Sequence, residues 1–535
     1  MLDRIWKENK IPIMIALLQW FFTTVLQVDR FFFIYESETV VFVLTKILYF
    51  FALATIWVFI FNVVQKIKNG DKEYKRGFEV FSIYFSILMM FLCILWPGTW
   101  SWDDALSLLT ERWYNWTDWQ HIFTGIFQMV LLQIMPFPGG IIFLQNLIIA
   151  LIVAFAVVKL EISFNIPRLK KHYLDIIVKL LPFLTPPVLM YQFSGYRMGV
   201  YIYVEFSMLI IWLCSIKDKK KWGWGYAFLF SALCAITATW RTESLFYIPL
   251  VNLGILFIKK EILSNKKKWS CIFLMICIYS GINYAQNQIL GNNSYKLISI
   301  IRPCTELVRA ADRDKDAELL EDLSRAFYLD VIYNNPEENG EVLYWNYGAV
   351  NSEHTDEDYK ACLKAFVRLC LKYPRVVIHE RCNLFINSTG IRGRTVSNVN
   401  QAYNFFDVDN GNNAAEEVKN AEWIANKPVF PILRKAMIYF LDMRIDNHGY
   451  ALKRVVWNII PPLIILIYFW CKTIQKKRWR EMLLMTAVLV KIPIIILTQP
   501  SEWFMYFLSF YFLGYVVFVY SSLIFIANIK KRKDT

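Results

Sequence analysis

Charged residues are scarce in this 535-residue chain: Asp, Glu, Lys and Arg together make up 19% of it, and histidine occurs only 5 times. Soluble globular domains average about 25% charged and about 45–50% apolar residues, whereas 56% of this chain is apolar. The composition therefore excludes an ordinary soluble enzyme, a disordered chain, a collagen and a small disulfide scaffold. Apolar residues in this excess have to lie in lipid.

Well-known catalytic and metal-binding motifs are also absent from the sequence. It has no GxSxG nucleophile elbow, no Walker loop and no HExxH. Its 10 cysteines form neither a CxxC pair nor a Cys/His cluster, so no metal site is predicted. No internal repeat is evident, although a transporter built from two related halves would show one.

Long apolar runs dominate what is present. A helix of about 20 apolar residues is long enough to cross the hydrocarbon core, and we interpret twelve apolar runs in the sequence as such helices. A further, short apolar run at 121–135 ends in a Pro/Gly-rich stretch. We interpret 121–135 as a re-entrant or interfacial helix, the alternative being a short span. The sequence thus predicts an α-helical polytopic membrane protein with about 12–13 transmembrane helices. The twelve main runs are 11–28, 40–64, 79–96, 141–158, 174–193, 199–216, 224–239, 245–258, 269–285, 455–471, 481–498 and 503–527.

Positive charge follows the loops on one side of these runs. Lysine and arginine cluster at the N-terminus, in alternate loops such as 66–76 and 217–221, and in the tail at 530–533. Because basic loops stay in the cytoplasm, both termini are predicted to lie on the cytoplasmic side of the plasma membrane. The net charge of +14 is then an orientation signal, and no nucleic-acid partner is expected. The loops predicted to face outside are 97–120, 194–198, 240–244, 286–452 and 499–502.

The segment 286–452 is the one long polar stretch of the chain. It holds 19 Lys and Arg against 23 Asp and Glu, and its apolar residues recur with helical spacing. We predict a mainly helical extracytoplasmic domain there, between a transmembrane module at 1–285 and further transmembrane helices at 453–535. Two disulfides, in three possible pairings, could join its four cysteines, which are Cys304, Cys362, Cys370 and Cys382.

The first large outer loop, 97–120, carries two adjacent carboxylates, Asp103 and Asp104, soon after a Pro-Gly break. A carboxylate beside low-dielectric lipid can have a raised pKa and act as a base toward a hydroxyl. The alternative is an ordinary helix over 104–112 whose N-terminus is capped by Ser101 or Asp103. Adjacent helical residues point about 100° apart, so at most one aspartate is expected to face a reacting group.

Aromatic residues crowd the same loop. Trp102 and Trp119 have flat indole faces suited to stacking on sugar rings or packing on a lipid chain, although an aromatic belt at the headgroup level has the same composition. His121 follows them. It could bind a phosphate, assist a base or orient a carboxylate, and the alternative is an ordinary polar residue at the membrane boundary.

Two further outer edges carry arginine and glutamate. Arg197 precedes the run that contains Glu205, and Arg241 is followed closely by Glu243. Ionisable residues at membrane depth are functional candidates, and a guanidinium is well shaped to hold a lipid phosphate. The alternatives are arginines that reach back to the headgroups and local Arg–Glu pairing. For Glu205 we expect a buried structural pair.

Together these features resemble the GT-C superfamily of membrane glycosyltransferases, which use sugars linked to polyprenyl phosphate. The resemblance rests on the order of the elements and on the loop sequence Pro97-Gly98-Thr99-Trp100-Ser101-Trp102-Asp103, followed by Trp119 and His121. The sequence departs from the family in three places. Of the family's outer-edge tetrad, which corresponds to 241–244, only Arg241 matches, and Ile122 replaces the proline that follows the histidine in the family. The family also has an Arg-Tyr pair before its last span, whereas the corresponding segment 502–506 keeps the tyrosine and lacks the arginine.

The resemblance implies an inverting transfer of a sugar from a polyprenyl-phosphate donor to an envelope glycan or a lipid-linked acceptor, on the outer membrane face. Asp103 would be the base, with Asp104 and His121 as further catalytic candidates. No cofactor is implied besides the lipid-linked substrate. The rival functions are a polysaccharide polymerase or ligase and a lipid or polysaccharide transporter (flippase). The residues expected to bind the donor are Arg241, Arg197, Trp102, Trp119 and Glu243.

Overall fold

The structure is a computed structural model of the chain. Its described residues fold almost entirely into helices, and the only β-type pairing among them is an isolated bridge between Phe327 and Val350. The structure describes all residues except 1, 29–32, 34–38, 112, 113, 115, 117–119, 218–220, 291–293, 338, 393–427, 444–450 and 535.

Seven helices among the described residues are long and apolar enough to cross a membrane. An eighth crossing is formed if α7 and the short helices after it count as one span, although the pair is bent by 72°. The molecule is therefore consistent with a multi-pass membrane protein. The seven are Val40–Lys68 in α2, Lys72–Leu95 (α3), Pro138–Ser163 (α6), Met198–Lys217 (α9), Ala451–Gln475 (α22 and α23), Trp479–Thr498 (α24 and α25) and Phe504–Ile529 (η7 and most of α26).

All twelve predicted runs fall on helices, but fewer of them than predicted have the length and apolarity of a span. At 1.5 Å per residue, α10 (Trp224–Trp240) is about 26 Å long, shorter than the hydrocarbon core of about 30 Å. Thr242–Phe257, which holds η3 and α11, and α5 (Ile122–Ile134) are shorter still. The two other runs lie in α1 (Leu2–Val25) and α12 (Asn265–Leu290), which also carry charged or amide side chains.

The predicted run 174–193 is broken because three prolines interrupt it. Proline cannot donate the hydrogen bond of a helix interior. Helix α7 (His172–Leu180) therefore gives way to a 3₁₀ turn, η2 (Leu181–Leu184), and then to α8 (Pro186–Gln192). The turn after α8 carries Arg197, so this break helps to position a candidate site residue.

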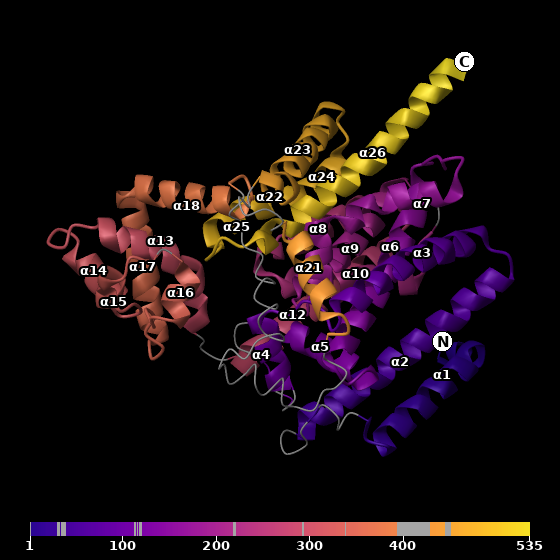
Figure 1. Ribbon diagram of the computed structural model, residues 1–535, viewed down its shortest axis with the longest axis horizontal. Helices are drawn as coiled ribbons and strands as arrows, with labels where there is room; N and C mark the ends of the chain where they lie inside the picture. Colours follow the sequence, from indigo (N-terminus) through magenta and orange to yellow (C-terminus); the bar gives the residue numbers. More distant parts are fainter. Residues whose placement is uncertain are drawn as a thin grey trace.

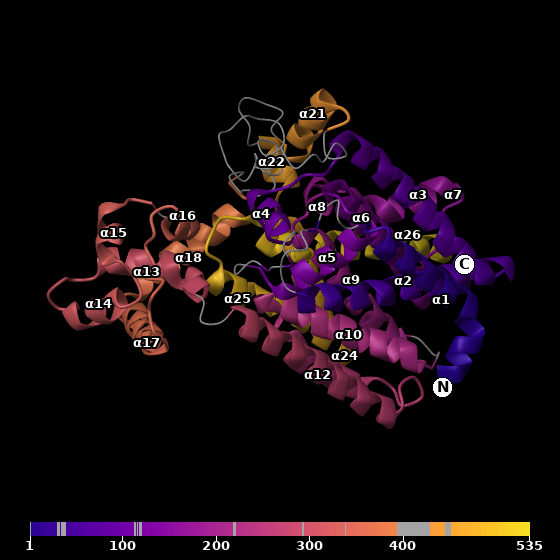
Figure 2. The same ribbon diagram turned by 90° about the horizontal axis from the view of Figure 1, so that it is seen from below.

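The long helices pack side by side around one continuous apolar core. Helix α6 lies between α3 and α9, α10 packs on α9 and α12, and α26 packs on α23. Helices α1 and α2 form a pair at the edge of this bundle, and both chain ends lie on the side away from α13 to α17 (Figures 1 and 2). Helix α4 (Trp102–Glu111) lies at the opposite end of the bundle, toward those helices (Figure 2).

The end of the bundle remote from α4 is held by a buried ion cluster. Arg76 of α3 pairs with Glu161 of α6 (2.8 Å) and with Asp175 of α7. Lys179 of α7 pairs with the same two carboxylates, at 2.7 Å and 2.8 Å. Because two cations face two anions, each buried charge has a partner, and the cluster ties three helices together.

Residues 298–388 form a separate helical unit with its own apolar core, here called the α13–α18 domain. The apolar spacing of Leu363, Val367 and Leu371 predicts the helix α17, which is present, but Val367 and Leu371 are exposed. The buried face of α17 is formed instead by Cys362, Ala365 and Leu369. A mainly helical domain was predicted across 286–452, and its later part lies largely outside the described residues. The helices are α13 (Ile298–Ala310), α14 (Ala317–Ser324), α15 (Leu329–Asn334), α16 (Gly340–Trp345), α17 (Asp356–Lys372) and α18 (Pro374–Ser388).

All ten cysteines are free thiols, so neither of the two disulfides considered from the sequence is present. Cys304 and Cys362 are buried in the core of the α13–α18 domain and serve there as small apolar residues. Beyond this domain, α21 (Pro431–Leu441) returns to the bundle and packs on α3 and α8. Its buried Arg434 donates to the carbonyl of Gly98 at 2.9 Å and so fixes the loop before α4.

Candidate functional site

The loop after α3 is held firmly against the end of α8. The Thr99 amide donates to the Phe193 carbonyl (2.8 Å), and its hydroxyl donates to the Met190 carbonyl (3.1 Å). Trp100 is fully buried and lies directly on Gly195, where a Cβ atom would come within 2.3 Å of the indole. The loop therefore delivers the start of α4 to the turn that follows α8.

Asp104 takes part in the capping of α4 by Ser101. Its Oδ2 accepts from the Ser101 amide (3.2 Å), and the Asp104 amide donates to Ser101 Oγ (3.5 Å), which together form a capping box. Ser194 also donates to this carboxyl, at 3.3 Å. Burial raises the pKa of Asp104 to about 8, so the group is mostly protonated at neutral pH. The capping alternative thus holds for Ser101, although the helix start that it caps is buried.

Asp103 differs from its neighbour because its carboxylate accepts no hydrogen bond from any described residue. Only its main-chain carbonyl is bonded, by the Ser107 hydroxyl (2.9 Å). The residue is half-buried. Burial raises the pKa of Asp103, and the nearby positive charge of Arg197 opposes that rise. A carboxylate with free oxygens and a positive neighbour can accept a proton from a ligand.

The phenol of Tyr196 is influenced by four of the charged groups at this end of the bundle. Burial raises the pKa of this phenol well above the usual value, and the negative charges of Asp103 and Asp104 raise it further. The positive charges of Arg197 and Arg241 act in the opposite direction. Four of the residues singled out from the sequence therefore lie within electrostatic reach of one phenol.

His121 is the residue that caps the start of α5, and it lies close enough to Arg197 for that positive charge to affect its pKa. Its Nδ1 accepts from the Phe123 amide (3.2 Å), which leaves the proton of a neutral ring on Nε2. Burial and the charge of Arg197 lower the pKa of His121 to about 4, so the ring is neutral at physiological pH. A neutral ring with a free Nε2–H donates a hydrogen bond and is not available as a base at Nδ1.

Arg241 and Glu243 form a buried pair between α10 and α11. Arg241 Nε and Glu243 Oε1 lie 2.6 Å apart, and the guanidinium carbon is 5.4 Å from the centre of the Tyr506 ring. The alternative of local Arg–Glu pairing therefore holds for this arginine. One nitrogen of its guanidinium, Nη1, is buried without a hydrogen-bond partner among the described residues, so it can still donate to a ligand.

Glu205 lies deeper in the bundle and forms the buried structural pair expected for it. Its Oε1 accepts from Lys491 Nζ (2.6 Å) and from the Tyr247 hydroxyl, and its Oε2 accepts from Ser509 Oγ (2.6 Å). Every oxygen is thus satisfied within the bundle. Glu205 joins α9, α11, α25 and α26 and offers no free group to a ligand.

Two carboxylates belong to this region although the sequence reading did not single them out. Glu111, at the end of α4, is buried, and burial together with the charge of Asp104 raises its pKa well above the usual value. Glu341 of α16 comes from the α13–α18 domain, and burial and the charge of Asp103 raise its pKa to about 8. Glu111 could have been found, because it lies seven residues after Asp104 on the same helical face. Nothing local in the sequence places Glu341 beside Asp103.

Several buried polar atoms in this region have no hydrogen-bond partner among the described residues. Most buried polar groups in proteins are hydrogen-bonded, so a group of exceptions in one place indicates a binding site for a polar ligand. Trp102 has no described side chain, and Trp119 lies outside the described residues, so their stacking role stays a prediction. The atoms are Asp104 Oδ1, Glu111 Oε2, His121 Nε2, Gln128 Oε1, Arg197 Nε and Arg241 Nη1.

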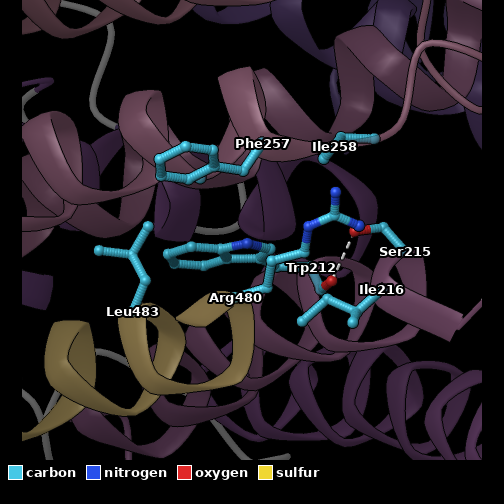
Figure 3. A pocket seen from close by; sticks show the side chains of 8 residues that line it. Trp212, Ser215, Ile216, Phe257, Ile258, Arg480 and Leu483 are labelled. Carbon is cyan, nitrogen blue, oxygen red and sulfur yellow. Dashed lines mark hydrogen bonds between the residues drawn. The ribbon is translucent and has the colours of Figure 1, made fainter. Parts of the chain in front are cut away.

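Metal binding has no support in the part of the chain that the structure describes, where no three His, Cys, Asp or Glu side chains gather as a ligand set. A separate small pocket between α9, α11 and α24 is lined by Trp212 and Arg480 among apolar side chains (Figure 3). Its volume of about 10 Å³ holds about one water. It also lies about 22 Å along α9 from Arg197, so it is not part of the candidate site.

Comparison with known proteins gives no relative: no family model, no curated protein and no solved structure matches this chain.

Proposed function

We propose that the chain is a membrane glycosyltransferase that moves a sugar from a polyprenyl phosphate to a cell-envelope glycan or a lipid-linked acceptor on the outer face of the plasma membrane. The observation that carries this proposal is the half-buried Asp103, whose carboxylate accepts no hydrogen bond from the described residues and lies near the Arg197 guanidinium. Such a pair supplies a base for a hydroxyl and a cation for a phosphate.

In the proposed reaction, Asp103 removes the proton from the acceptor hydroxyl while that oxygen attacks the anomeric carbon. The bond from this carbon to the phosphate oxygen breaks, and its electron pair leaves with the polyprenyl phosphate. One direct displacement of this kind inverts the anomeric centre. Because phosphate is a good leaving group, no strong general acid is needed.

The donor phosphate would be held by arginine side chains at the mouth of the bundle. Arg197 Nε and Arg241 Nη1 are buried and have no hydrogen-bond partner among the described residues, so both can donate to a ligand. His121 would donate its Nε2–H to a phosphate or sugar oxygen, since its neutral ring is already fixed by the Phe123 amide. Glu243 would act on the donor through Arg241 by holding that guanidinium in place.

The finer topology is part of this proposal. It has twelve crossings in a GT-C-like arrangement, with 121–135 as a helix that does not cross, both termini in the cytoplasm and the α13–α18 domain outside the cell. This arrangement is supported by the basic loops of one side and by the position of both termini on the side of the bundle away from that domain (Figure 2).

The proposal is tested in a deletion strain by complementation with the wild type, Asp103→Asn or Asp104→Asn. We expect the deletion to remove one sugar from the envelope polysaccharide, and the wild type and Asp104→Asn to restore it. Asp103→Asn should leave that sugar missing at a normal level of membrane protein. A transporter function is favoured instead if Asp103→Asn restores the sugar in full, because transport needs no base at that position.

A further inference from the structure

A groove runs along the α13–α18 domain between α13 and α18, with a volume of about 480 Å³. One helix contributes Arg302, Glu306 and Arg309, which recur with the spacing of a single helical face. The other contributes Arg375 and His379 in the same way. Polar side chains from both helices thus line the groove.

The floor of the groove is closed by ion pairs. Arg302 Nε lies 2.9 Å from Glu380 Oε1, and Arg302 Nη2 donates to Glu502 at 3.3 Å. Arg309 is also engaged, through Glu306 (2.7 Å) and the main-chain carbonyl of Glu337 (3.0 Å). These groups shape the groove, and their charges are largely matched.

The rim carries positive charge that is not matched. Arg375 is exposed and forms no ion pair or hydrogen bond with another described residue, and His379 is exposed one turn further along, where its ring is hydrogen-bonded to Asn383. The surrounding residues 298–388 hold 11 Lys and Arg against 16 Asp and Glu. Although the domain is net negative, the groove lining holds three arginines against two glutamates, so the free guanidinium at its rim gives a local binding point for a negatively charged ligand.

The groove lies directly beside the candidate site. A Cβ atom at Gly340 would be 3.4 Å from the Cβ atom of Arg302 in the groove floor, and the next residue is Glu341, whose pKa responds to Asp103. Ser501, next to Glu502, donates to Asn339 at 3.2 Å. Gly340 thus contacts the floor of the groove, and the adjacent Glu341 lies within electrostatic reach of Asp103.

We propose that this groove binds the acceptor, and that the acceptor is an acidic glycan that carries phosphate or carboxylate groups. That the bound glycan is an acceptor rests on the proposed function, whereas binding of an acidic glycan in the groove does not depend on catalysis. In this proposal, Arg375 and His379 contact the acidic groups of the glycan, and the end of the glycan extends past α16 to Asp103. The domain extends beyond the bundle end (Figure 1), so the groove meets a soluble polymer more readily than a lipid surface.

The test is a binding titration of the full-length protein in detergent with an oligo(glycerol phosphate) probe. Neutral dextran of similar length is the control ligand. We expect Arg375→Gln to weaken binding of the probe about fivefold, because an exposed charge-assisted contact is lost. Arg368→Gln, which removes an exposed arginine of α17 outside the groove, should leave binding unchanged. Dextran should bind at least about fivefold more weakly than the probe.

The inference is overturned if Arg375→Gln and Arg368→Gln bind the probe equally well, or if dextran binds as tightly as the probe. Competition by anionic lipid vesicles that disappears in Arg375→Gln would also overturn it, in favour of a lipid surface. The role of Asp103 is tested separately by sugar transfer, which Asp103→Asn should lose, whereas the groove is tested by the affinity of the probe for Arg375→Gln and Arg368→Gln. Failure of the groove and failure of the transferase proposal therefore give different results.

Discussion

At the scale of single residues, two adjacent aspartates have different environments. Asp104 is buried, capped by Ser101 and mostly protonated, whereas Asp103 is half-buried and its carboxylate is not bonded by any described residue. The sequence predicted that at most one of them faces a reacting group, because adjacent helical side chains diverge. Helix geometry alone did not decide which one: the resemblance placed the base at Asp103, whereas the capping alternative named Ser101 or Asp103 as the cap.

This difference predicts opposite results for two conservative substitutions. Asp103→Asn should lower the transfer rate about 100-fold or more, the usual contribution of a positioned general base. Asp104→Asn should lower it less than about tenfold, because the amide oxygen can still accept from Ser101 and Ser194. Rates are measured on purified protein with matched Tm values. Equal losses in both variants would contradict the assignment of the base to Asp103.

The protonated state of Asp104 also predicts how stability depends on pH. Its ordinary pKa is 3.8 and burial raises it to about 8, so between these values the unfolded chain releases a proton that the folded chain keeps. Stability from this group is therefore full below about pH 4 and is lost as the pH rises toward about 8. We expect Asp104→Asn to show a smaller fall in Tm between pH 5 and pH 8 than the wild type. Parallel Tm curves would show that Asp104 is ionised in the folded protein.

At the scale of elements, the sequence predicted the helices well because long apolar runs dominate the chain. It predicted the spans less well, because a run of apolar residues does not reveal how its helix bends or where it ends. The run 174–193 is interrupted at Pro182 and Pro186, and 224–239 forms a helix of only 17 residues. Hydropathy measures the preference for lipid, whereas the break depends on proline and on packing.

The loop between α3 and α4 gives a prediction for backbone geometry. Gly98 has φ of +112°, and a Cβ atom there would come within 2.7 Å of both Ile142 and the Phe193 carbonyl. Gly98→Ala should cost about 2–3 kcal/mol of stability and should also reduce the transfer rate, because the loop carries Asp103. Gly281→Ala in α12 is the control, since no atom lies within 4 Å of its Cβ position. The Tm values of the two variants are measured by thermal unfolding at the same pH. Similar values would contradict the expected strain at position 98.

At the scale of the whole molecule, the candidate site is assembled from distant segments. Residues near 103, 121, 197 and 241 come together at one end of the bundle, and α16 adds Glu341 from another domain. The first four could be selected from the sequence because each is a polar residue at the edge of an apolar run. Glu341 could not, because its position depends on how the α13–α18 domain docks on the bundle.

The orientation of the bundle gives the last prediction. If basic segments are cytoplasmic, the α13–α18 domain and Asp103 lie outside the cell, and Lys266 in the basic first turn of α12 lies inside. Cys382 of α18 is exposed, so a variant that keeps only this cysteine should react with a membrane-impermeant maleimide in intact cells. A variant whose only cysteine is Lys266→Cys should react only after the cells are permeabilised. The reverse pattern would place the site in the cytoplasm, where envelope glycans are not exposed, and would rule out sugar transfer on the outer face.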